Sequence, residues 1–270
     1  MRKLFYIVSI MVVFSLSSCA ANTSSDTKTE EAMLNEIIQY FEETDNRSFE
    51  ISYPVNIENA EYYRITVYGI LNNGDRYPID VFAISPKNYD RYFYNSNTNQ
   101  FQRFYNYPTY ACKTSPDKKM RIESIGMGTD GPSGAHALRE MRIINLSTGN
   151  IEWNGKSYLW NRFMWSDDSR FVAVQFSGRQ WTTTNAIDTN NYCIINLPGL
   201  NDVLELIPDA TELNEYAPIP LFTITEWENS TIIIGFKWGT NICTEVIGTY
   251  KYDIINDTID IIEIDEVQSG

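Results

Sequence analysis

The chain has 270 residues, of which 43% are hydrophobic and 14% aromatic, enough to bury one large core or two small ones. Its 35 acidic and 21 basic side chains give a formal charge of −14, spread along the whole sequence. Phosphate backbones repel such a chain, so we expect no nucleic-acid partner. Tyrosine occurs 18 times beside many valines, isoleucines and threonines, and this composition favours strands over helices.

The N-terminus has the features of a secretory signal peptide. Arg2 and Lys3 supply a positive start, and an apolar run follows from Leu4 to Phe14. A helix that spans a bilayer needs about 20 apolar residues, and this run has only about half of them. We therefore interpret residues 1–18 as a segment that is removed after export.

The end of this segment, Leu16-Ser17-Ser18-Cys19, resembles the lipobox of bacterial lipoproteins. The resemblance implies cleavage before Cys19 and fatty-acid chains on that cysteine. Two or three chains hold a protein firmly to a membrane. The expected location is thus the outer face of the bacterial cytoplasmic membrane, and the alternative is an ordinary signal peptide with a chance cysteine. Residues 19–29 would form the lipidated cysteine and a flexible tether.

A small α+β domain is predicted over residues 30–108. Apolar residues recur at three- and four-residue spacings in Glu30–Glu43, which predicts one helix. Two hairpins then follow, one turning at Asn72–Asp75 through Asn-Gly and one at Asn95–Asn99. A helix packed on one face of an antiparallel sheet is a compact unit.

Residues 109–270 carry a repeated pattern of a polar turn followed by an apolar strand. The three copies are Ser115–Ile122, Trp165–Val174 and, in degraded form, Trp227–Phe236. Each is followed by a second strand that ends in a turn of its own, namely Met141–Leu146, Tyr192–Leu197 and Tyr250–Ile255. The pattern predicts successive antiparallel sheets.

This pairing of turn and later strand resembles the blades of WD-repeat-like and TolB-like β-propellers. The resemblance implies four-stranded sheets that bury their faces against one another. About 150 residues hold about three blades, and closed propellers have about four or more. The N-terminal sheet would supply a fourth, or the sheets form an open stack, or the region is a simple meander. The fold class expected is therefore mainly β, with propeller-like sheets after a small α+β unit.

Residues 165–188 are also similar to extracytoplasmic domains of Gram-positive lipoproteins and of β-lactam-sensing membrane proteins. This likeness implies a sensing or accessory role and supplies no catalytic residue. The His-Glu-x-x-His motif of metalloproteases does not occur in the sequence.

The single histidine, His136, lies in the glycine-rich stretch Gly126–His136. A hydrolase would need it as the base for a nucleophile such as Ser133, which lacks the strand, turn and helix setting of such serines. We expect no catalytic residue there, and we take Gly128, Asp130 and His136 as candidate contacts for a ligand or partner.

Aromatic residues and acidic pairs supply the remaining site candidates. Exposed aromatic rings stack on sugars or anchor partner proteins, and we single out Trp160 and Trp181. Asp167 with Asp168, and Glu226 with Glu228, are carboxylate pairs of the kind that glycosidases use. With 35 acidic residues, such pairs also arise by chance.

Three cysteines remain after Cys19, namely Cys112, Cys193 and Cys243. Two of them could form a disulfide outside the cell, and buried free thiols are the alternative. No Cys-x-x-Cys spacing occurs, so we expect neither a zinc site nor any other cofactor.

The sequence therefore predicts a membrane-anchored, non-catalytic binding or sensing module at the cell envelope. Its expected partners are the membrane through Cys19 and either another envelope protein or a glycan. The alternative is a carbohydrate-binding or carbohydrate-processing surface protein.

Overall fold

A computed structural model of the chain describes residues 29–104, 110–127, 138–157, 160–177, 182–207, 220–239 and 244–268. The predicted signal peptide and most of the predicted tether lie outside these ranges, as does the predicted domain boundary at residue 108. Within them, no helix is both long and apolar enough to cross a membrane.

The described strands form four antiparallel sheets, and in each sheet the strands follow chain order. The first sheet comprises β1 (Arg47–Ile57), β2 (Ala60–Ile70), β3 (Arg76–Ile84), β4 (Arg91–Asn95) and β5 (Gln100–Arg103). The second comprises β6 (Cys112–Thr114), β7 (Met120–Met127), β8 (Leu138–Asn145) and β9 (Ile151–Lys156). The third comprises β10 (Trp160–Trp165), β11 (Phe171–Ser177), β12 (Thr182–Asp188) and β13 (Cys193–Asn196). The fourth comprises β14 (Leu221–Glu228), β15 (Thr231–Gly239), β16 (Thr244–Asp253) and β17 (Thr258–Gln268).

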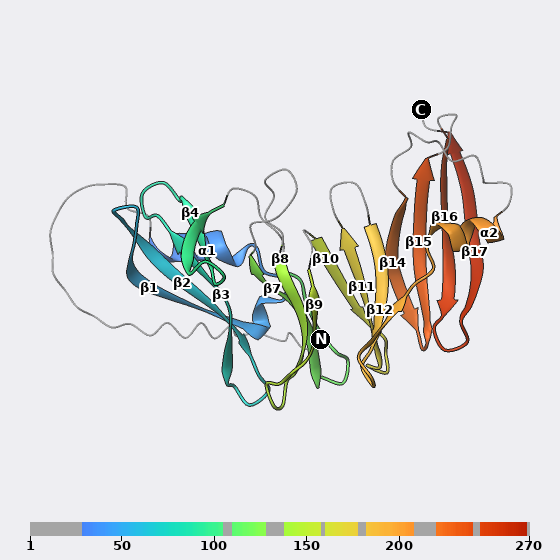
Figure 1. Ribbon diagram of the computed structural model, residues 1–270, viewed down its shortest axis with the longest axis horizontal. Helices are drawn as coiled ribbons and strands as arrows, with labels where there is room; N and C mark the ends of the chain where they lie inside the picture. Colours follow the sequence, from blue (N-terminus) through green and yellow to red (C-terminus); the bar gives the residue numbers. More distant parts are fainter. Residues whose placement is uncertain are drawn as a thin grey trace, which may run out of the picture.

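The sheets stand in a row and do not close into a ring (Figure 1). This arrangement confirms the predicted fold class, a mainly β chain with propeller-like sheets and one N-terminal helix. Of the alternatives, the open stack is the one observed. Each sheet of the row buries a face on its neighbour, which an isolated four-stranded sheet cannot do.

Two tryptophans in equivalent positions tie consecutive sheets together. The indole N–H of Trp165, at the end of β10, donates to the carbonyl of Lys113 in the second sheet at 2.9 Å. The indole N–H of Trp227 in β14 donates to the carbonyl of Met164 in the third sheet at 3.0 Å. Both rings are buried in the cores between the sheets. Apolar packing and a directed hydrogen bond therefore set the spacing from each sheet to the next.

The first helix is shorter than predicted. α1 spans Glu30–Ile38, with the Thr29 hydroxyl accepting from the amide of Ala32, and the predicted extension to Glu43 is wrong. The carbonyl of Tyr40 instead accepts from the amide of Tyr110, and the Phe41 ring stacks on the Tyr110 ring at 4.3 Å. A short 3₁₀ turn, η1 (Thr44–Asn46), then leads into β1. Contacts with a residue distant in sequence thus outweigh the local helical pattern.

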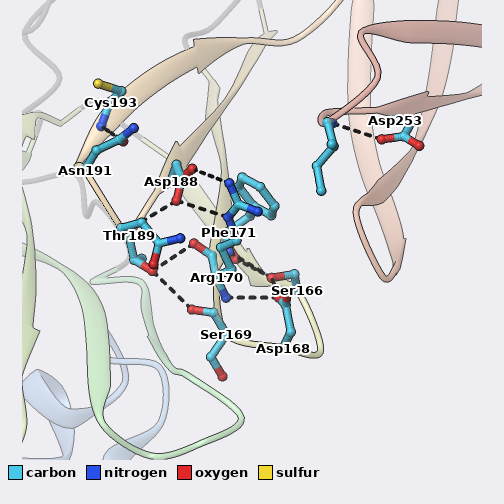
Figure 2. Close-up of polar contacts among 12 residues, drawn as sticks. Ser166, Asp168, Ser169, Arg170, Phe171, Asp188, Thr189, Asn191, Cys193 and Asp253 are labelled. Carbon is cyan, nitrogen blue, oxygen red and sulfur yellow. Dashed lines mark hydrogen bonds and ion pairs between the residues drawn. The ribbon is translucent and has the colours of Figure 1, made fainter.

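The predicted hairpin turns are confirmed. β2 and β3 pair across residues 71–75, and β4 and β5 pair across residues 96–99. In the second and third sheets, the Ser-x-Asp turns form the same network twice. The hydroxyls of Ser115 and Ser166 donate at 2.7 Å to Asp117 and Asp168 respectively. Each hydroxyl also accepts the amide of the returning strand, as Figure 2 shows for Ser166 and Phe171.

One predicted equivalence is wrong. Tyr192–Leu197 does not match Met141–Leu146 and Tyr250–Ile255 as predicted, because β13 is the fourth strand of its sheet, whereas β8 and β16 are third strands. The third strand of that sheet is β12. The turn after β12 begins at Asp188, whose carboxylate accepts the amide of Asn190 at 3.0 Å. Asn145 and Asp253 close the third strands of the second and fourth sheets in the same way. A short acceptor side chain at the strand end, and not an apolar run, marks the equivalent position.

Of the cysteines that the structure describes, Cys112 and Cys193 are free thiols. Cys112 is buried, and this burial raises the pKa of its thiol to about 12. Cys193 is exposed on the edge strand β13, so the expectation of a buried thiol is wrong for it. Cys243 lies outside the described residues.

Candidate binding groove at the seam of the first two sheets

The structure describes the side chain of none of the predicted contact residues. Cys19, Gly128, Asp130, His136 and Trp181 lie outside the described residues. Trp160 begins β10, where its backbone pairs with Ser177, and its side chain is not among those described.

The predicted carboxylate pairs lie at exposed positions. The Asp168 carboxylate is occupied by its own turn, where it accepts from the Ser166 hydroxyl and the Arg170 amide. Glu226 and Glu228 are both exposed on β14, on either side of the buried Trp227.

Charged residues are concentrated where β7 and β8 of the second sheet face β3 of the first, an interface that we call the seam. Glu123 is 0% exposed, and Arg142 donates to its carboxylate at 2.9 Å. The Tyr77 hydroxyl donates to the other carboxylate oxygen at 3.1 Å and accepts from Arg121 at 3.1 Å. Burial and the charge of Glu123 raise the pKa of Tyr77 far above its usual range, so its hydroxyl keeps the proton it donates. The buried carboxylate is thus held from two sides.

A second buried carboxylate ties the same interface at Asp80 of β3. It accepts from the Tyr110 hydroxyl and, at 3.0 Å, from the amide of Met127 at the end of β7. Apolar packing continues across the seam, because Ile125 and Met127 of β7 belong to the same core as the first sheet and α1. The first two sheets are therefore held together by both polar and apolar contacts.

Beside the seam, a shallow and open groove of about 600 Å³ lies between the β4–β5 turn of the first sheet and strands β8 and β9 of the second. Its lining consists of Ser96, Asn97, Glu140, Asn154, Gly155 and Lys156. Strand register connects this lining to the buried pair, since Arg142 lies opposite both Glu123 and Asn154. Glu140 and Lys156 face each other across β8 and β9. The buried ion pair and the groove are thus neighbouring parts of one sheet face.

Both walls of the groove are held by local contacts. On one side, the Asn97 amide donates to the buried side chain of Asn95 at 2.9 Å, which fixes the β4–β5 turn. On the other side, the Trp153 ring crosses Gly155 so closely that an added Cβ would lie 2.5 Å from Cη2 of the ring. A side chain at position 155 would therefore force the Trp153 ring to shift.

The lining combines one carboxylate, one ammonium group, two amides and one hydroxyl. Such groups form hydrogen bonds in every direction and carry no net charge, which suits a polar ligand of low charge. The described residues hold no group of three or more His, Cys, Asp or Glu side chains that could bind a metal ion.

Sequence reasoning did not single out any of the six lining residues. Glu140, Asn154 and Lys156 lie on ordinary alternating strands, and only the turn at Asn95–Asn99 was foreseen. The lining residues come from two sheets, and no local pattern records which strands will face each other.

No family model matches the chain, and no curated protein matches it. Similar solved structures include the open-velcro β-propeller domain of the Trilobed protease from Pyrococcus furiosus, at 14% identity and a TM-score of 0.36 over 80% of this chain and 57% of that one. TolB from Acinetobacter baumannii matches at 12% identity and a TM-score of 0.32, over 84% of this chain and 55% of that one. A prolyl endopeptidase matches at 10% identity and a TM-score of 0.36, over 80% of this chain and 36% of that one. TM-scores this low support no conclusion about this chain. The propeller-like description therefore depends on the strand order of the chain itself.

Proposed function

We propose that the protein is a lipid-anchored, non-catalytic binding or sensing module on the outer face of a bacterial cytoplasmic membrane. The groove at the seam is the observation that carries the binding role. Its polar lining lies beside a buried ion pair and a fixed turn, so the backbone that carries the binding groups is held in place before a ligand arrives. The lipobox-like Leu16–Cys19 supports the anchoring, and the envelope partner or glycan would approach from outside the cell.

A carbohydrate ligand is the second candidate, and the lining supports it. Amide and hydroxyl side chains match the hydroxyl groups of a sugar. A processing enzyme would need two carboxylates about 5 to 10 Å apart. Of the described lining residues, Glu140 is the sole carboxylate, so the groove supports sugar binding over sugar cleavage.

The anchoring is tested by replacing Cys19 with alanine in the full-length protein. Without the sulfur no lipid is attached, so the variant should leave the membrane fraction, whereas the wild-type protein should remain there until detergent is added. Fractionation and mass spectrometry of the N-terminal peptide measure both effects. The Cys193→Ala variant, which removes an exposed thiol far along the chain from the lipobox-like segment, is the control and should stay on the membrane. A membrane-bound Cys19→Ala protein would contradict the proposal.

Binding in the groove is tested with soluble peptidoglycan fragments and chitooligosaccharides. A ligand at 100 times its Kd stabilises the folded state by about 2.7 kcal/mol, which raises the midpoint of thermal unfolding. We expect this rise for the wild-type protein and its loss in the Asn154→Ala/Lys156→Ala variant.

The matched control is Asn190→Ala/Lys251→Ala, which removes the same two side-chain types from exposed positions outside the groove. It should respond to the ligand as the wild-type protein does. Equal responses from both double variants would place the ligand elsewhere, and cleavage of the oligosaccharide would contradict a non-catalytic role.

A further inference from the structure

The last strand, β17, is an edge strand of the fourth sheet, and with 11 residues it is as long as β1 at the edge of the first sheet. The final strands of the first three sheets have 4, 6 and 4 residues, whereas β17 has 11. Among the strands that the structure describes, β17 pairs with β16 alone. It also lies at the outer end of the row of sheets (Figure 1). A long free edge presents a row of unpaired backbone N–H and C=O groups.

Apolar side chains on this edge are open to solvent. Ile262 is 53% exposed and Ile264 is 38% exposed, among the most exposed large apolar residues described. The four consecutive residues Ile262–Asp265 are all exposed, so side chains on both faces of the strand reach solvent there. The register with β16 is also irregular at this point, after Thr249. An added strand would bury this surface.

The charge of the edge selects what could pair with it. Residues 258–268 include Asp260, Glu263, Asp265 and Glu266 and no basic residue. Like charges opposite each other destabilise strand pairing, so a second copy of β17 is a poor partner. Lys251 of β16 lies 3.7 Å from Asp260, but both side chains are about half exposed or more, so this pair neutralises little of the charge. A strand with basic side chains would complement the edge.

We propose that β17 is a docking edge for an extended, basic segment of another protein, in which lysine or arginine alternates with aliphatic residues. The added strand would form backbone hydrogen bonds with β17 and cover Ile262 and Ile264. Backbone pairing supplies affinity in such complexes, and the alternating side chains supply specificity. This surface is separate from the groove, so the inference does not depend on the proposed ligand site.

The probe is a seven-residue peptide in which lysine alternates with valine, added to the full chain in detergent. A second peptide with the same sequence carries an N-methyl group on every peptide nitrogen, which keeps its charge and removes all of its backbone amide donors. We expect the first peptide to bind and the second to bind at least tenfold more weakly. Isothermal titration calorimetry at low salt measures both.

Two double variants distinguish binding at the β17 edge from nonspecific attraction of a basic peptide to an acidic protein. Glu263→Lys/Asp265→Lys should weaken binding about tenfold, since it turns two attractive cross-strand contacts into repulsive ones. Glu226→Lys/Glu228→Lys makes the same charge change at exposed positions of β14, the opposite edge of the same sheet, and should leave binding unchanged.

Three results would overturn the proposal. They are no binding at 1 mM peptide, equal binding of the two peptides, and equal weakening by the two variants. A dimer of the wild-type protein that Glu263→Lys/Asp265→Lys disrupts would likewise overturn it, because the occupant would then be a second copy.

Discussion

Replacing Arg142 with methionine is expected to lower the free energy of unfolding by about 3 to 5 kcal/mol, which urea denaturation followed by tryptophan fluorescence would measure. The reason is the burial of its partner. Glu123 is 0% exposed, and without Arg142 its carboxylate would keep only the hydrogen bond from Tyr77. An uncompensated charge inside a protein costs far more than an exposed one.

Two further variants make this prediction specific. Lys251→Met breaks an exposed ion pair with Asp260 and should change the free energy of unfolding by about 0 to 1 kcal/mol. Glu123→Met/Arg142→Met removes both buried charges and should be more stable than Arg142→Met alone, since no carboxylate is left unpaired. If Arg142→Met costs no more than Lys251→Met, the seam is not held by the buried pair.

Trp227→Ala should destabilise the protein by about 3 to 5 kcal/mol, the usual range for truncating a buried aromatic residue. The ring is 6% exposed and stacks on Phe171 of the third sheet with centroids 6.0 Å apart. Its N–H also donates to the Met164 carbonyl. Truncation would open a cavity between the third and fourth sheets and remove the hydrogen bond that joins them.

The control for this prediction is Trp227→Phe, which keeps an aromatic ring against Phe171 and removes the hydrogen bond. Its cost should be smaller, about 1 to 3 kcal/mol, because the Met164 carbonyl is left without its partner. Hydrogen exchange should show the loss of protection mainly in β10–β17, with the first two sheets less affected. A uniform loss of exchange protection over all four sheets would contradict this prediction. It would mean that the four sheets unfold as one unit and that the Trp227 contact does not stabilise the third and fourth sheets locally.

The turns of this protein can be predicted from its sequence because contacts between residues close in the chain form them. Asn-Gly at residues 73–74 and the Ser-x-Asp turns at Ser115 and Ser166 each close within a few residues. The same spacing predicted successive antiparallel sheets, and the structure confirms them. The order of strands in each sheet followed from these hairpins, since neighbours in sequence pair with one another.

Contacts between distant residues decided the rest. Tyr110 ends the helix at Ile38 through Tyr40 and Phe41, about 70 residues away, and no helical pattern could reveal this. The seam joins Tyr77 to Glu123 and Arg142, which lie on different sheets. In the sequence these residues are ordinary polar positions on alternating strands, and they become a buried network only when the two sheets pack together.

The sequence by itself thus determined the class of fold, the hairpins and the expectation of a lipid anchor at Cys19. The tertiary structure decided that the row of sheets stays open, that Asn154 and Lys156 line a groove, and that β17 pairs on one side only among the described strands. The physical reason is the separation along the chain of the residues that make each feature. Turns depend on contacts between neighbouring residues, whereas grooves and edges depend on which faces remain uncovered once the sheets have packed together.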